Sequence, residues 1–96
     1  FSPSGWRERV TVVEYPERSE WRFFSISSET GQMENELLRI RVYSVQDYQD
    51  NTGSGFELAT KGIFRYWGYI PSTASGDLAV TETEVKTVMF SLLTTS

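Results

Sequence analysis

Gly62-Ile63-Phe64-Arg65-Tyr66-Trp67-Gly68-Tyr69-Ile70-Pro71 is the stretch of the sequence that decides the fold. Four of the six residues from 64 to 69 are aromatic, and a proline ends the run. Aromatic side chains favour extended backbone and proline cannot donate a sheet hydrogen bond, so we predict a central β-strand over 63–70. Successive side chains of a strand alternate between its faces, which places Ile63, Arg65, Trp67 and Tyr69 on one face and Phe64, Tyr66, Gly68 and Ile70 on the other.

Four other segments have the composition of strands. In 36–44, apolar side chains alternate with arginines and a tyrosine, a period of two that marks one buried face and one wetter face. The segments 9–15 and 20–27 are rich in β-branched and aromatic residues, and Pro16 to Ser19 has the length of a hairpin connection between them. We also predict a loop over 28–35, a strand over 56–60 and a tight turn at Lys61-Gly62.

The last part of the sequence has the pattern of an amphipathic helix that begins at Thr81. Glu84 follows three residues later, which is the spacing of a capping box. An apolar stripe at intervals of three and four residues then predicts which side of the helix is buried. The stripe consists of Val85, Val88, Met89 and Leu92, and Phe90 and Leu93 widen it.

These segments predict a single α+β domain over residues 1–96. Its expected architecture is a five-stranded, mainly antiparallel meander sheet with a C-terminal helix packed on one face. One helical turn is expected over 45–50 and a flexible link over 51–55. Trp6, which follows the turn-rich segment 1–5, is expected to cap one end of the core.

The 96 residues include no histidine and no cysteine. Without histidine, the sequence excludes a Ser-His-Asp triad, an imidazole base and a histidine metal ligand. Without cysteine, it excludes a thiol nucleophile, a disulfide and a zinc ribbon. An enzyme would be restricted to carboxylate chemistry or to a metal held by oxygen ligands, and we expect no cofactor.

The formal net charge of −4 bears on the possible partners. Nine lysines and arginines are scattered among thirteen acidic residues, whereas nucleic-acid-binding proteins concentrate positive charge to replace counterions. We therefore expect no DNA or RNA partner. No apolar run reaches the roughly eighteen residues of a membrane span, so none is predicted in this chain. An export signal or a lipid anchor is expected to lie upstream of Phe1.

Four motifs stand out along the chain: Pro3-Ser4-Gly5-Trp6, the aromatic strand Trp21-Arg22-Phe23-Phe24, the strand from Leu37 to Ser44, and the turn and strand from Gly62 to Ser72. Together they resemble the motifs of small extracytoplasmic domains, secreted or lipoprotein, from Gram-positive gut bacteria. More remotely, the chain resembles the PsbP-like α+β fold, whose members are mostly binding or accessory proteins. The resemblance implies secretion or lipid anchoring, and it carries over no catalytic residue.

Pairs of carboxylates offer one route to catalysis, since glycoside hydrolysis needs an acid and a base close together. Asp47 and Asp50 stand near each other in one segment, and Asp77, Glu82 and Glu84 in another. The segment around Asp47 and Asp50 also offers oxygen ligands for calcium, although its spacing is not that of an EF-hand. The simpler interpretation is a solvated turn in the first case and acidic residues at the positive end of a helix dipole in the second.

The aromatic strand supplies the main candidates for a binding site. If the helix covers Phe64, Tyr66 and Ile70, then the opposite face is turned outward. A binding strip there would stack on sugar rings or anchor a protein partner, whereas the more economical interpretation is packing. The candidate residues are Arg65, Trp67 and Tyr69, joined by Trp21 or Tyr43 from neighbouring strands.

The leading functional expectation is a non-enzymatic extracytoplasmic binding or accessory domain with an unknown protein or carbohydrate partner. The alternative is a structural or assembly module that docks onto another protein through the outer face of the sheet. A carboxylate-based hydrolase is third. The sequence leaves the oligomeric state open.

Overall fold

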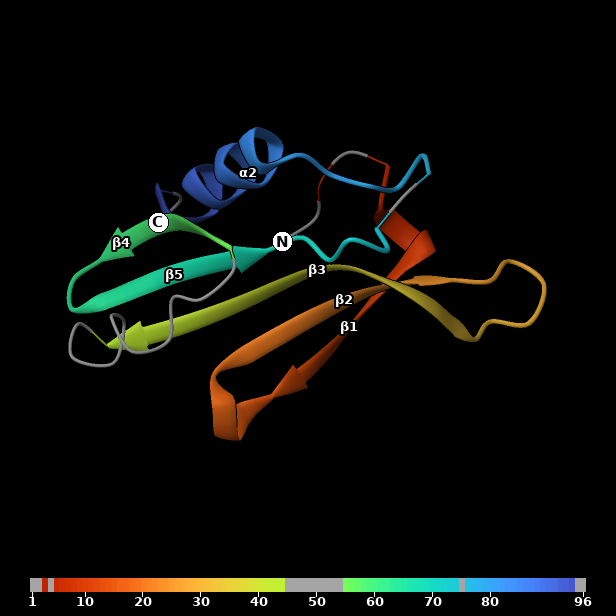
Figure 1. Ribbon diagram of the computed structural model, residues 1–96, viewed down its shortest axis with the longest axis horizontal. Helices are drawn as coiled ribbons and strands as arrows, with labels where there is room; N and C mark the ends of the chain where they lie inside the picture. Colours follow the sequence, from red (N-terminus) through yellow and green to blue (C-terminus); the bar gives the residue numbers. More distant parts are fainter. Residues whose placement is uncertain (1–2, 4, 45–54, 75, 95–96) are drawn as a thin grey trace.

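The computed structural model describes residues 3, 5–44, 55–74 and 76–94 (Figure 1). It confirms the predicted fold class, because five antiparallel strands form one sheet in the order β1-β2-β3-β5-β4 and a C-terminal helix packs against it. The helical turn predicted over 45–50 and most of the link over 51–55 lie outside the described residues. The elements are η1 (Arg7–Arg9), β1 (Val10–Tyr15), η2 (Pro16–Arg18), β2 (Glu20–Ile26), β3 (Met33–Ser44), β4 (Phe56–Lys61), β5 (Phe64–Tyr69) and α2 (Glu82–Thr94).

The order of the last two strands differs from that of a simple meander. β5 pairs with β3, with Trp67 opposite Arg41, and it also pairs with β4, which lies at the edge of the sheet. A strand inside a sheet has neighbours on both sides and buries more apolar surface than an edge strand does. The inner position therefore suits the aromatic β5 better than it suits β4, which carries a register shift between Glu57 and Ala59.

β3 begins three residues earlier than the sequence predicts. The turn before it is closed by the N–H of Ser27, which donates to the carbonyl of Gln32 at 2.9 Å, and Met33 pairs with Ile26. The predicted loop is therefore wrong over residues 33–35. This end of the strand is exposed, so its polar side chains give no alternation of buried and exposed positions from which the strand could be recognised.

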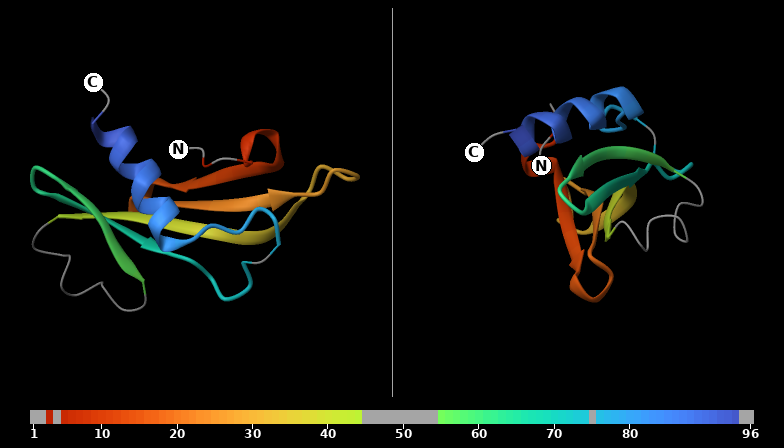
Figure 2. Two further views of the ribbon diagram at one scale, coloured as in Figure 1. Left: turned by 90° about the horizontal axis from the view of Figure 1, so that it is seen from above. Right: turned by 90° about the vertical axis from the view of Figure 1, so that its left-hand side faces the viewer.

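Helix α2 runs obliquely across the sheet and packs mainly against β4 (Figure 2). Its residues Val85 and Met89 are buried, as the apolar stripe predicts. Leu92 is 49% exposed and Phe90 is 69% exposed, so the predicted stripe is wrong at these two residues, whereas Leu93 packs against the core as predicted. The last turns of α2 therefore present apolar side chains that the sheet does not cover.

Trp6 closes one end of the core. Its indole Nε1 donates a hydrogen bond of 2.8 Å to the carbonyl of Leu78, in the loop before α2. Its ring lies 5.4 Å from that of Phe23, measured between centroids. The expected capping role of Trp6 is confirmed, and the contact joins the N-terminal segment, β2 and the loop before the helix.

Candidate functional site

The two faces of the sheet are covered by different parts of the chain. The helix face is the one beneath α2, and it carries the buried apolar cluster that includes Phe23, Ile40 and Met89. The outer face is the opposite one. Tyr43, Trp67 and Tyr69 lie on the outer face, as the alternation along β5 predicts for Trp67 and Tyr69.

The ring of Trp67 lies between those of Tyr43 and Tyr69 on the outer face. The rings of Trp67 and Tyr69 are stacked, with centroids 6.3 Å apart and planes inclined by 5°. Tyr43 meets Trp67 edge-on at 6.4 Å. Trp67 is only 7% exposed and Tyr43 is buried as well, so packing, the more economical of the two interpretations, holds at these two residues, and they form no open strip.

Gly55 explains why Trp67 is covered. This glycine has a φ of 127°, and a Cβ atom placed on it would collide with the Trp67 ring and with the carbonyl of Gly68. The backbone just before β4 therefore lies directly on the indole ring, an approach that only glycine permits. Burial of the ring depends on where this backbone runs, which the alternation along β5 does not contain.

Ion pairs neutralise much of the charge on the outer face. Glu20, only 3% exposed, pairs with Arg22 and with Arg41, whose Nε lies 3.0 Å from its carboxylate. Glu36 accepts two hydrogen bonds of 2.8 Å from Arg39, and these bonds raise the pKa of the guanidinium. The Glu20–Arg41 pair joins β2 to β3, whereas the Glu20–Arg22 and Glu36–Arg39 pairs each lie within one strand. We assign these pairs a structural role.

Arg65 belongs to none of these ion pairs. It is partly buried opposite Tyr43, and its Nη1 atom has no hydrogen-bond partner within the described part of the chain. A guanidinium beside aromatic rings is suited to binding a carboxylate or a sugar. Binding by Arg65, Trp67, Tyr69 or Tyr43 remains a prediction.

Trp21 lies on the helix face, away from the other candidates. It pairs with Ile40 on β3 and contacts the buried apolar cluster. Phe64 also differs from its predicted place beneath the helix, because it is 48% exposed. It stands at the β4–β5 turn, which projects beyond α2 in Figure 2, whereas Tyr66 and Ile70 pack against the core as predicted.

An apolar groove of about 380 Å³ lies on the helix face, between the second half of α2 and the strands β1 to β3 and β5. Trp21 forms part of its wall, and the half-exposed Val12 and Leu92 stand at its rim. None of its lining residues is an aspartate, glutamate, lysine or arginine, and its polar side-chain groups are the Trp21 indole N–H and the Tyr66 hydroxyl. The groove is lined by Val12, Trp21, Phe23, Ile40, Tyr66, Met89, Leu92 and Leu93.

Sequence analysis did not identify this groove, although the sequence contains a sign of it. A helix is about 10 Å wide and neighbouring strands are about 4.8 Å apart, so one helix covers roughly two strands. Five predicted strands and one helix therefore leave part of the helix face uncovered. Val12 and Trp21 belong to the two strands that lie farthest from β4 in the sheet.

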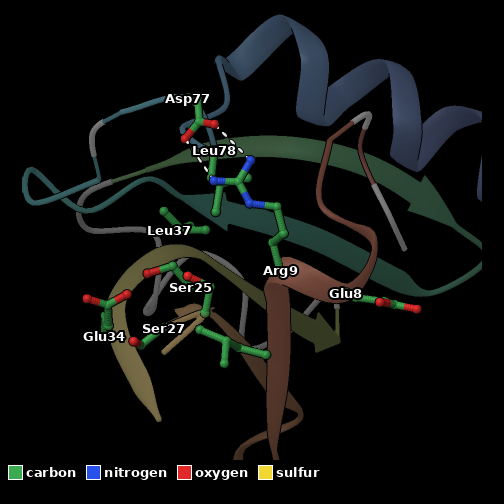
Figure 3. A pocket seen from close by; sticks show the side chains of 10 residues that line it. Glu8, Arg9, Ser25, Ser27, Glu34, Leu37, Asp77 and Leu78 are labelled. Atoms are coloured by element: carbon green, nitrogen blue, oxygen red, sulfur yellow. Dashed lines mark hydrogen bonds and ion pairs between the residues drawn. The ribbon is translucent and has the colours of Figure 1, made fainter. Parts of the chain in front are cut away.

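A second, polar pocket of about 340 Å³ lies where β1 begins (Figure 3). The guanidinium of Arg9 donates to the two carboxylate oxygens of Asp77, at 2.8 and 3.3 Å, across this pocket. These hydrogen bonds hold the pKa of Asp77 below its usual value and raise that of Arg9. The ion pair ties η1 to the loop before α2, and it leaves Asp77 a poor general acid.

The acidic candidates at the start of α2 take part in contacts within the helix. Glu82 pairs with Lys86 at 2.8 Å, and the backbone N–H of Glu84 bonds to the hydroxyl of Thr81. Within the described residues, no group of three or more acidic side chains could hold a metal ion. Asp47 and Asp50, the candidates for calcium or for catalysis, lie outside the part of the chain that the structure describes.

Comparison with known proteins gives no match: no protein-family model, curated protein or solved structure is significantly similar to this chain. The resemblance to small extracytoplasmic domains therefore remains a prediction. Among the described helices, none is long and apolar enough to cross a membrane.

Proposed function

We propose that this protein is a non-enzymatic, extracytoplasmic binding domain, and that the groove on the helix face takes a small apolar ligand. The observation that carries the proposal is the uncharged groove between α2 and the sheet, with Trp21 in its wall. Its volume of about 380 Å³ lies within the range of small-molecule sites, which is roughly 300–1,000 Å³. The extracytoplasmic location is supported by the motif resemblance.

The chemistry of the lining defines the class of ligand. Aliphatic, aromatic and thioether side chains bind apolar surface through its removal from water. The indole N–H of Trp21 is a donor, and the hydroxyl of Tyr66 is a donor and an acceptor, so the ligand has room for one or two polar groups. A charged ligand is disfavoured, because the lining offers it no counter-charge.

The alternative of docking through the outer face has less support. The described part of that face is occupied by Glu20 and its arginine partners, which do not form a flat apolar surface. Partly buried Arg65 is the feature that favours a partner there, and such a partner would have to be polar or acidic.

A titration with the neutral dye Nile red tests the proposal, because the dye fluoresces strongly in apolar surroundings. We expect saturable binding to the wild type. Leu92→Gln should weaken binding about fivefold or more, since it removes an apolar side chain from the rim. Phe90→Gln is the matched control: it removes an exposed apolar side chain from the same helix, but one outside the groove.

The same titration contains the outcomes that would contradict the proposal. Absence of saturable dye binding by the wild type would exclude an accessible apolar site. Equal weakening by both variants would show that the dye binds elsewhere. Near-ultraviolet circular dichroism of each variant separates a local effect on the groove from a loss of tertiary packing.

A further inference from the structure

β1 is an open edge of the sheet. Among the strands that the structure describes, it pairs with β2 alone, over the six residues from Val10 to Tyr15 and without a register shift. Figures 1 and 2 show it on the side of the sheet remote from β4. A regular edge strand presents a row of unpaired peptide groups to which another strand can add.

The other edge, β4, is protected against such addition. A register shift between Glu57 and Ala59 interrupts its regular pairing, α2 packs against it, and Lys61 ends it with a charge. These are features by which proteins prevent strand pairing at an edge. β1 has no such shift, and it carries four uncharged residues in succession, from Val10 to Val13.

The direction of the peptide groups in β1 follows from the register. The N–H of Val42 donates to the carbonyl of Ser19 at 3.0 Å, and Glu20 stands opposite Arg41. In an antiparallel ladder, this pattern turns the peptide groups of Glu20 away from β3 and towards β1. Tyr15 stands opposite Glu20, so the peptide groups of Tyr15 bond to β2. The direction alternates along a strand, and the other odd-numbered residues, Thr11 and Val13, therefore bond to β2 as well. The peptide groups of the even-numbered residues Val10, Val12 and Glu14 therefore point to the open edge.

We propose that β1 is the dimerisation edge of this protein, where the β1 strand of a second copy adds antiparallel about a twofold axis at Val12. In this register Val12 stands opposite its own symmetry mate, and Val10 stands opposite Glu14. Residues of equal parity face one another, so the helix faces of both copies lie on the same side and one ten-stranded sheet results. No charge within β1 is opposite a like charge, and the interface is isologous.

The position of Val12 supports a second copy as the occupant of this edge. Val12 is 49% exposed, although it is a β-branched residue in the middle of a strand, and it stands at the rim of the groove. Pairing with its symmetry mate removes both valines from water and brings the two grooves side by side. Dimerisation does not depend on the proposed function, because it uses the strand edge and requires no ligand.

Analytical ultracentrifugation of the full chain tests the proposal. Protein concentrations between roughly 1 µM and 1 mM suit the weak affinity expected of a small interface. We expect a reversible monomer–dimer equilibrium for the wild type. Val12→Lys and Val12→Glu should each weaken dimerisation at least about tenfold, because like charges then meet across the axis. An equimolar mixture of these two variants should restore the dimer, since lysine then faces glutamate.

Ile63→Lys is the matched control, because Ile63 is an exposed apolar residue at the β4–β5 turn, far from β1. It should leave the equilibrium unchanged. A wild type that stays monomeric throughout the range would overturn the proposal. A dimer that is insensitive to both Val12 variants, or a mixture that fails to dimerise, would overturn it as well. Restoration by the mixture cannot result from unfolding of the single variants.

Discussion

At the scale of single residues, buried Tyr43 makes the stability of the fold depend on alkaline pH. Burial raises the pKa of the Tyr43 phenol above its usual value of 10.0. The folded state therefore keeps the proton at a pH where the unfolded chain has lost it. The stabilising contribution is complete below the unfolded pKa, and it is lost as the pH rises towards the folded pKa.

We predict that the free energy of unfolding falls as the pH rises past about 10, the ordinary pKa of tyrosine, and that Tyr43→Phe reduces this fall. Urea unfolding of both proteins at neutral pH and at several alkaline values measures the difference. Near neutral pH, the free energy of unfolding of either protein should change little with pH. Parallel pH profiles for the two proteins up to pH 11 would contradict the assignment to Tyr43.

Glu20 is the second residue from which a specific effect follows. Glu20→Ala leaves Arg22 and Arg41 without their shared carboxylate in a buried place. Loss of one partner from a buried pair costs about 3–5 kcal/mol, and partial exposure of the two arginines reduces this to about 2–4 kcal/mol. Glu36→Ala, which removes the partner of Arg39 alone, should cost less in urea unfolding. A smaller loss for Glu20→Ala than for Glu36→Ala would exclude the proposed bridging role.

At the scale of elements, helix α2 begins at an N-cap that the sequence predicts correctly. The backbone N–H of Glu84 donates to the hydroxyl of Thr81 at 3.1 Å. Thr81→Ala should lower the free energy of unfolding by about 1 kcal/mol, whereas Thr81→Ser should keep most of it, because the accepting oxygen remains. Thermal or urea unfolding gives both values. Equal stabilities of the alanine and serine variants would show that the hydroxyl does not cap the helix.

The sequence predicts elements well where local pattern determines them. The alternation along β5 correctly separates Tyr66 from Trp67, and the capping residue locates the start of α2. The exchange of β4 and β5 in the sheet depends on which strand buries more apolar surface, a comparison between distant segments. The burial of Trp67 depends on the backbone at Gly55, and the place of Trp21 depends on its register with Ile40. Such non-local contacts have no signal in the period of a single strand.

At the scale of the whole molecule, one helix is not wide enough to cover five strands. The helix covers the sheet on the side near β4, and Trp6 and Leu78 close one end of the core. Among the described residues, the side near β1 is left uncovered. The groove results from this imbalance, and the free edge of the open sheet at β1 lies beside it. A site for an apolar ligand and an edge for a second copy therefore lie next to each other on the open side.

The open side predicts an alternating pattern of amide hydrogen exchange along β1. In the monomer, the amides of Val10, Val12 and Glu14 point to solvent and should exchange at least about tenfold faster than those of Thr11, Val13 and Tyr15, which bond to β2. Two-dimensional NMR of the deuterium-exchanged protein resolves the six amides. Raising the protein concentration should slow the first three selectively, because their new partners are the peptide groups of the second copy. The opposite alternation would contradict the register from which the dimer is derived, whereas alternation unchanged by concentration would leave the register correct and exclude the dimer.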